Sequence, residues 1–106
     1  MSTSDDFQKI LEESPIVLFM KGNAAFPMDS SGASVVQYLN DVGCRPRTID
    51  ILQDPEIKRS LRNATNATPP PVLYINSELV GGYDAIMERL DSGDLERMLS
   101  TASARP

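Results

Sequence analysis

The fold is decided by the stretch Pro69-Pro70-Pro71-Val72-Leu73-Tyr74-Ile75-Asn76-Ser77-Glu78-Leu79-Val80-Gly81-Gly82. Three consecutive prolines supply no backbone N–H donors, so residues 63–71 are predicted to be irregular. Residues 72–75 and 78–80 are two short apolar-rich runs around a two-residue turn, which predicts an antiparallel hairpin. The glycine pair that follows indicates a close approach of the backbone to another segment.

Two further strands are predicted upstream of this hairpin. Residues 16–20, Ile-Val-Leu-Phe-Met, form a continuous apolar run that is typical of a central strand buried on both faces. Residues 47–51, Arg-Thr-Ile-Asp-Ile, form the next strand. A helix is expected between these two strands, and a crossover of that kind makes them a parallel pair.

Helices are predicted around the strands from their capping residues. The first begins near residues 2–4 and ends at Ser14-Pro15, because the residue before a proline disfavours the α conformation. The second covers residues 30–42 and ends at Gly43 in a left-handed conformation. The third begins at Asp54-Pro55, an acidic cap followed by proline at the first helical position. Two more helices are expected after the glycine pair.

The predicted order of elements is therefore α-β-α-β-α-β-β-α-α. This order predicts an α/β fold in which a four-stranded mixed sheet carries helices on both faces. A length of 106 residues accommodates one domain. Its core is expected over about residues 7–99, followed by a frayed tail at residues 101–106.

The composition excludes several chemistries. The chain has no histidine, which is the usual general base at neutral pH and the commonest metal ligand. Its single cysteine, Cys44, excludes an intrachain disulfide and a Cys-x-x-Cys redox pair. A thiolate or imidazole metal site within one chain is therefore excluded by ligand count.

Charge and hydropathy restrict the partners and the location. The formal net charge of -5 repels phosphate backbones, so no nucleic-acid partner is expected. The longest apolar run, residues 16–20, is far shorter than the ~20 residues that span a bilayer, so no membrane partner is expected. The polar, acidic N-terminus is unlike a secretory signal. Together these features predict a cytoplasmic protein.

Four separated motifs carry a resemblance to a known family. They are Val17-Leu-Phe-Met-Lys-Gly22, Phe26-Pro27, Asp50-Ile-Leu-Gln-Asp-Pro-Glu-Ile57 and Glu78-Leu-Val-Gly-Gly-x-Asp84. With a proline directly before the third strand, they resemble the monothiol glutaredoxins, whose active site reads Cys-Gly-Phe-Ser. The resemblance covers about residues 7–99 and implies the thioredoxin fold for the chain as a single glutaredoxin-like domain, residues 1–106.

The active-site motif departs from the family pattern. Where the family places Cys-Gly-Phe-Ser, this chain has Asp29-Ser30-Ser31-Gly32. The resemblance therefore implies that Asp29 stands at the nucleophile position, and that the chain has no catalytic cysteine. A carboxylate suits the positive end of a helix but does not exchange disulfides or ligate an iron–sulfur cluster as a thiolate does. Asp29 is interpreted as the cap of the second helix, and the alternative is that it acts as an acid or base.

Cys44 is not expected to replace the missing nucleophile. It follows the second helix at the end opposite Asp29, and a dozen helical residues span about 18 Å. We expect a surface or half-buried thiol there, and the alternative is a redox role through intermolecular pairing.

The resemblance also implies a glutathione groove. Lys21 and Lys58 match basic positions that pair with a carboxylate of the tripeptide, and the alternative for both is a solvated charge. Gly82, Tyr83 and Asp84 match the turn that receives the γ-glutamyl end. Asp84 is in addition a candidate cap for the helix that follows.

The same resemblance implies that the groove is weakened. Pro71 matches the family's cis-proline, and the residue before it pairs its backbone with the cysteinyl unit of glutathione. That residue is Pro70, which has no N–H, so one hydrogen bond of ~0.5–1.5 kcal/mol is lost and binding falls about two- to tenfold. Ala67 and Ser31 stand where the family carries tryptophan and phenylalanine, which thins the apolar walls.

These inferences predict a glutaredoxin-like protein that works as a non-catalytic binding or adaptor module. No cofactor and no iron–sulfur cluster are expected. The expected ligand is weakly held glutathione or a peptide, and the resemblance implies a protein partner, of the BolA type or a second copy, at the active-site face. The alternative is a glutathione-dependent disulfide oxidoreductase or an iron–sulfur-related monothiol glutaredoxin. A third possibility is a chain altered by design or decay that only folds.

Overall fold

The helices and strands follow the predicted order within residues 3–103, the part of the chain that the computed structural model describes. The elements are α1 (Thr3–Glu13), β1 (Ile16–Met20), α2 (Ser30–Asp41), β2 (Arg47–Asp50), α3 (Pro55–Ala64), β3 (Val72–Ile75), β4 (Glu78–Gly81), α4 (Tyr83–Ser92) and α5 (Asp94–Ser103). None of these helices combines the length and the apolar character that a membrane crossing needs.

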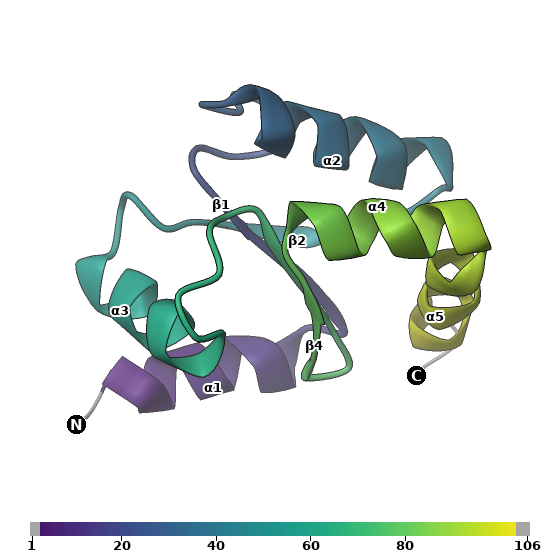
Figure 1. Cartoon of the computed structure of the whole chain (residues 1–106). Coiled ribbons are helices and arrows are strands. Elements are labelled where there is room, and N and C mark those ends of the chain that lie inside the picture. The colour runs from purple at the N-terminus through teal and green to yellow at the C-terminus, as the bar shows by residue number, and fades with distance from the viewer. Residues whose placement is uncertain (1–2, 104–106) are drawn as a thin grey trace.

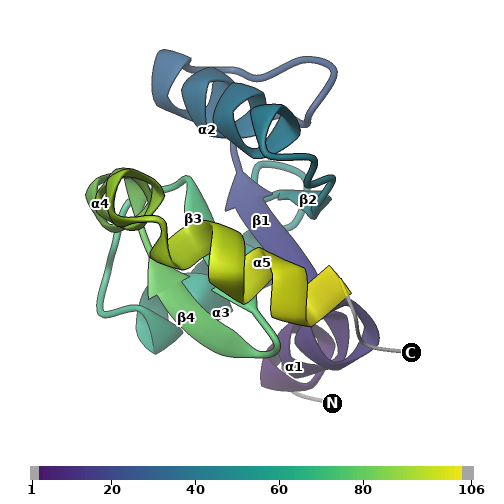
Figure 2. The ribbon, with the colours of Figure 1, turned by 90° about the vertical axis from the view of Figure 1, so that its right-hand side faces the viewer.

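The strands form one mixed sheet in the order β2-β1-β3-β4. β1 pairs parallel with β2 and antiparallel with β3, and β3 pairs antiparallel with β4. Helices α1 and α3 cover one face and α2 and α4 the other (Figure 1), and α5 crosses the second face beside α4 (Figure 2). The predicted four-stranded mixed sheet with helices on both faces is confirmed.

The central strand β1 separates two hydrophobic cores. All five of its residues are buried, as predicted. Ile16, Leu18 and Met20 pack in the core that includes residues of α2, α4 and α5, whereas Val17 and Phe19 pack in the core that includes residues of α1 and α3. This alternation is the two-residue period of a strand that faces apolar helices on both sides.

The hairpin turn, the cap of α3 and the glycine after α2 have their predicted conformations. Asn76 and Ser77 both have positive φ, 53° and 66°, which is the backbone of a two-residue hairpin turn. The carboxylate of Asp54 accepts hydrogen bonds from the amides of Glu56 and Ile57 at the start of α3. Gly43 follows α2 with a φ of 79°.

Several element boundaries differ from the prediction; α2 ends one residue earlier and β4 one residue later, and three other differences have a local cause. α3 continues to Ala64, so residues 63 and 64 are helical, because the first proline, Pro69, restricts the residue directly before it and not residues five or six positions upstream. The frayed tail predicted at 101–106 is wrong for residues 101–103, which continue α5, since neither glycine nor proline interrupts residues 94–105. Residues 104–106 lie outside the described part. β2 ends at Asp50, one residue earlier than predicted, because the Asp50 carboxylate accepts a hydrogen bond from the Leu52 amide and turns the chain.

Gly22 and Gly43 form a matched pair for a test of backbone packing. Both have positive φ, 84° and 79°. A Cβ atom on Gly22 would lie 2.3 Å from the carbonyl oxygen of Phe26, whereas a Cβ on Gly43 would meet nothing within 4 Å. Gly43→Ala is therefore expected to cost only the left-handed conformation, about 1–2 kcal/mol, and Gly22→Ala to cost at least ~2 kcal/mol more. Urea denaturation measures both, and equal losses would contradict the packing described here.

Candidate functional site

The candidate site begins where the two parallel strands end. The Asp50 carboxylate, at the end of β2, accepts hydrogen bonds from the amides of Gly22 at 3.1 Å and Leu52 at 2.9 Å. The amide of Ile51 also donates to the Met20 carbonyl oxygen at 3.0 Å. Lys21 therefore projects from a backbone that is held on both sides, directly after β1.

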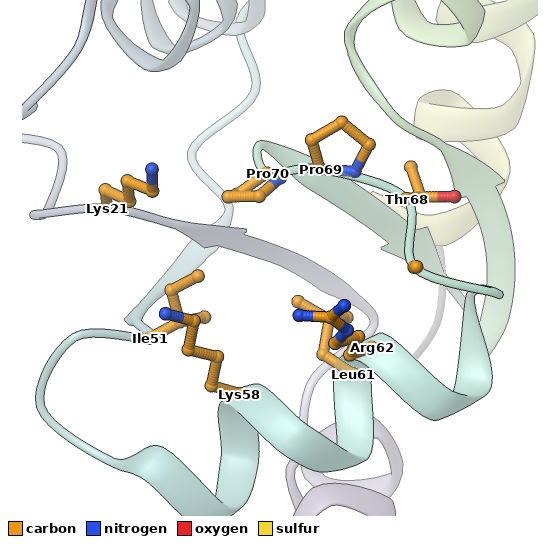
Figure 3. A pocket seen from close by; sticks show the side chains of 9 residues that line it. Lys21, Ile51, Lys58, Leu61, Arg62, Thr68, Pro69 and Pro70 are labelled. Atoms are coloured by element: carbon orange, nitrogen blue, oxygen red, sulfur yellow. The ribbon is translucent and has the colours of Figure 1, made fainter.

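A cavity of about 260 Å³ lies between this strand end, α3 and the loop before β3. We call residues 68–70 the proline loop and this space the cationic cavity. Lys58 and Arg62 rise from α3 toward the proline loop, and Lys21 lies at the end of β1 (Figure 3). The lining residues are Lys21, Ile51, Lys58, Leu61, Arg62, Ala67, Thr68, Pro69 and Pro70.

A second hollow lies on the other side of the proline loop, at the start of α4, and we call it the α4 hollow. Its lining residues are Ser31, Thr68, Pro69, Pro70, Gly82, Tyr83, Asp84 and Ala85. The two spaces share all three residues of the proline loop. Together they make an elongated surface with the proline loop in its middle.

The predicted groove residues thus fall into two groups that meet at Pro70. Lys21 and Lys58 line the cationic cavity, and residues 82–84 line the α4 hollow. Pro71 lines neither space, because it is buried beneath the loop. The peptide bond between Pro70 and Pro71 is cis.

The start of α4 is open toward the α4 hollow. Gly82 is its N-cap residue, and no side-chain hydrogen bond caps the helix among the described residues. Asp84 lies in the first turn of α4, so the expectation that Asp84 caps this helix is wrong. A Cβ atom on Gly82 would lie 2.8 Å from Cγ2 of Thr68, which confirms the close approach predicted from the glycine pair. The free N–H groups of an uncapped helix start are suited to an anionic group.

The start of α2, in contrast, is capped from within. Asp29 is its N-cap residue, and Asp29 Oδ1 accepts a hydrogen bond from the Gly32 amide at 2.8 Å. The Ser31 hydroxyl also approaches this oxygen at 3.5 Å. The interpretation of Asp29 as a helix cap is confirmed. The carboxylate satisfies one helix N–H and interacts favourably with the positive end of the helix.

Cys44 is buried, and the expectation of a surface or half-buried thiol is wrong. Its side chain is 5% exposed and belongs to the core that includes residues of α2, α4 and α5. The chain turns back at Gly43, and the Cys44 amide donates to the Leu39 carbonyl oxygen at 2.8 Å, which brings the thiol under the helix. Burial raises the pKa of the Cys44 thiol. At the end of α2 opposite Asp29, it is neither exposed nor ionised as a redox nucleophile must be.

Arg62 is a site residue that the sequence analysis did not assign. It lines the cationic cavity with Lys58, four residues earlier on α3. The signal was present, because residues four apart on a helix share a face. Only the position of α3 beside the proline loop shows that this face borders a cavity.

Comparison with known proteins gives the chain its relatives. The Glutaredoxin family model matches residues 16–80. The chain is 35% identical over 104 residues to glutaredoxin 4 of Escherichia coli strain K12, covering 98% of this chain and 90% of that protein. It is 34% identical over 104 residues to an uncharacterised monothiol glutaredoxin of Porphyra purpurea, covering 98% and 97%. The solution structure of reduced apo GrxS14 from poplar matches with a TM-score of 0.82 at 29% identity, covering 95% and 93%.

The buried thiol makes stability depend on pH. Below about pH 8.5 the thiol is protonated in the folded and the unfolded chain, so it contributes no pH dependence. Above that pH the unfolded chain releases the proton while the folded chain, whose Cys44 pKa is raised, retains it. The free energy of unfolding therefore falls as pH rises.

We expect this fall between pH 7.5 and 9.5 to be smaller in Cys44→Ala than in the unmodified chain. Tyr74, whose pKa is also raised by burial, is common to both chains and cancels in the comparison. Urea denaturation at the two pH values gives the difference, and identical slopes would contradict a buried thiol.

Proposed function

This chain belongs to the glutaredoxin family, with monothiol glutaredoxins among its relatives, and from that premise we propose that it is a non-catalytic binding module for glutathione or a small peptide. One observation carries the proposal. The position that the resemblance assigns to the nucleophile holds a carboxylate engaged as a helix cap, while the residues of the groove still gather around the proline loop.

The proposed absence of disulfide exchange follows from the chemistry of the reaction. Exchange requires a thiolate to attack a disulfide sulfur and form a mixed disulfide. The Asp29 side chain contains no sulfur, and its Oδ1 accepts a hydrogen bond from the Gly32 amide. Cys44, the only sulfur nucleophile of the chain, is buried in the core.

The two spaces beside the proline loop suit the two ends of a glutathione-like ligand. A terminal carboxylate fits the cationic cavity between Lys21 and Lys58. The γ-glutamyl end carries an α-carboxylate and an ammonium group. In the α4 hollow, the uncapped start of α4 would take the carboxylate and the Asp84 side chain the ammonium.

The middle of such a ligand would be held weakly. Pro70 lines both spaces and offers a carbonyl acceptor without an N–H donor. Ala67 and Ser31 are short side chains on the walls of the two spaces. We therefore expect an affinity in the millimolar range.

An iron–sulfur cluster does not fit the residues of this site. Such clusters are held mainly by cysteine thiolates. The start of α2 carries Asp29, and Cys44 lies buried beyond the other end of the same helix. Among the described residues, no three histidine, cysteine, aspartate or glutamate side chains come together as a metal-binding group.

The alternative function is that of a thiol enzyme, either a disulfide oxidoreductase or an iron–sulfur-related monothiol glutaredoxin. Only the names of the relatives favour it.

A protein partner at the face around Asp29 and a cytoplasmic location stay predictions. Two large apolar side chains in the loop before α2, Phe26 and Met28, are 76% and 66% exposed at that face.

Binding is tested by isothermal titration with reduced glutathione. We expect weak heats that fit a millimolar dissociation constant and that disappear in Lys21→Glu, because this change reverses a charge in the cationic cavity. Lys9→Glu makes the same charge change on exposed α1 and should bind as the unmodified chain does. Absence of heat at millimolar ligand would reject the binding function.

Catalysis is tested by reduction of a glutathione mixed disulfide. We expect no turnover above background for the unmodified chain or for Cys44→Ser. Asp29→Cys should attack the glutathione sulfur of the mixed-disulfide substrate, release the substrate thiol and carry the glutathione as a protein mixed disulfide, detected by mass spectrometry, because a thiolate at a helix start is stabilised and reactive. Turnover by the unmodified chain that survives Cys44→Ser and disappears in Asp29→Ala would establish the enzyme alternative.

A further inference from the structure

We propose that the cationic cavity binds a group with two negative charges, so that the preferred ligand ends in a dianion rather than in a single carboxylate. The inference rests on the proposed function, because it specifies the ligand of the same groove. It depends on Arg62, which lies beyond the positions that the resemblance assigned.

Three cations line this one cavity without an acidic neighbour in its wall. They are Lys21, Lys58 and Arg62, and the other described lining residues are apolar or uncharged. The chain has only three lysines and a formal net charge of -5, yet two of those lysines border this space. The positive charge at this cavity is therefore opposite in sign to the net charge of the chain.

No carboxylate of the protein neutralises these cations. Among the described side chains, the ion pairs are those of Arg47 with Glu13 and Arg97 with Asp94, both outside the cavity. Lys21, Lys58 and Arg62 therefore have no carboxylate oxygen within ion-pair distance in the part that the structure describes. Their mutual repulsion is relieved only by solvent, salt or a bound anion.

The positions of the three cations suit two anionic groups or one doubly charged group. Lys21 lies toward one end of the cavity and Arg62, next to Leu61 on α3, toward the other, with Lys58 also on the α3 wall (Figure 3). A single carboxylate held by the two lysines would leave the guanidinium of Arg62 unused. Guanidinium presents paired N–H donors that match a carboxylate or a phosphate, so it suits the second charge.

The size of the cavity limits how much of a ligand it takes. At about 260 Å³ it is smaller than the roughly 300–1,000 Å³ of a complete small-molecule site. It therefore accommodates one end of a ligand whose remainder crosses the proline loop. Ala67, which also lines the cavity, contributes only a methyl group to it. The ligand class is a small peptide or conjugate that ends in two carboxylates or in a phosphate monoester.

The test compares ligands that differ in their terminal charge. Isothermal titration is carried out with γ-glutamyl-cysteinyl-glycine and with γ-glutamyl-cysteinyl-aspartate at equal ionic strength. Inorganic phosphate is titrated separately against acetate as the singly charged control. We expect the doubly charged member of at least one pair to bind about fivefold more tightly, which corresponds to one additional exposed charge contact. A gain for the aspartyl peptide assigns two carboxylates, and a gain for phosphate assigns a phosphate monoester.

Two variants on the same helix attribute the preference to Arg62. Arg62→Ala should remove the gain, so that the two members of each pair bind this variant equally. Arg59→Ala removes an exposed arginine of α3 that does not line the cavity and should retain the gain. Equal binding of both members of each pair, or a gain that persists in Arg62→Ala, would overturn the inference.

The outcomes also separate this inference from the proposed function. If glutathione binds and no dianion is preferred, only the inference fails. If neither peptide binds but phosphate binds in an Arg62-dependent manner, the glutathione function fails and the dianion site stands.

Discussion

Burial of β1 on both faces is the constraint on which the rest of the molecule depends. A strand whose five residues are all buried must lie inside the sheet and needs helices above and below it. The two cores on either side of β1 supply those helices, α2, α4 and α5 on one face and α1 and α3 on the other. The position of β1 also determines the edge of the sheet at which the chain leaves it.

The edge of the sheet at which β1 ends determines the position of the candidate site. β1 and β2 are parallel, so their carboxyl ends lie at the same edge of the sheet, and open α/β sheets place ligand sites at such edges. Asp50 holds this edge together through the Gly22 amide. The antiparallel strand β3 enters at the same edge, because residues Phe19 and Val72 are paired. The proline loop, which precedes β3, therefore lies opposite Lys21 without any special interaction to bring it there.

Two helix starts near this edge differ in how their positive ends are satisfied. α2 is satisfied internally, because the Asp29 carboxylate accepts the Gly32 amide. α4 begins at a glycine and has no side-chain cap in the described structure. In the proposed function, this difference explains why the start of α4 binds a ligand and the start of α2 does not carry out thiol chemistry. The start of α4 remains available to an external anion, whereas the start of α2 already carries a negative charge that would repel a thiolate or a second carboxylate.

Local signals in the sequence were enough for most of the fold. The apolar run at 16–20, the Asp54-Pro55 cap and the Asn76-Ser77 turn each depend on a few adjacent residues, and each was predicted correctly. The depth of Cys44 could not be predicted in this way. The burial of Cys44 depends on the hydrogen bond from its amide to the Leu39 carbonyl oxygen and on packing in a core that also contains residues of α5, which lie about half the chain length away in sequence.

The site residues also divide into those that the sequence could assign and one, Arg62, that it could not. Lys21, Lys58 and residues 82–84 were assigned through the family resemblance, since no periodicity or spacing marks them as a groove. Arg62 matched no motif, and its position depends on the packing of α3 next to a loop formed later in the chain. A residue whose role is created by tertiary contact alone is found only when those contacts are known.

The net charge of the chain is a poor guide to what this edge of the molecule binds. A charge of -5 repels an anion at long range, but salt screens that field beyond about 8 Å at physiological ionic strength. Within the cavity the nearest charges are the ammonium and guanidinium groups of Lys21, Lys58 and Arg62, so the local potential is positive. The net charge therefore slows the approach of a small anion little at physiological ionic strength, and the positive potential within the cavity decides whether the anion stays bound.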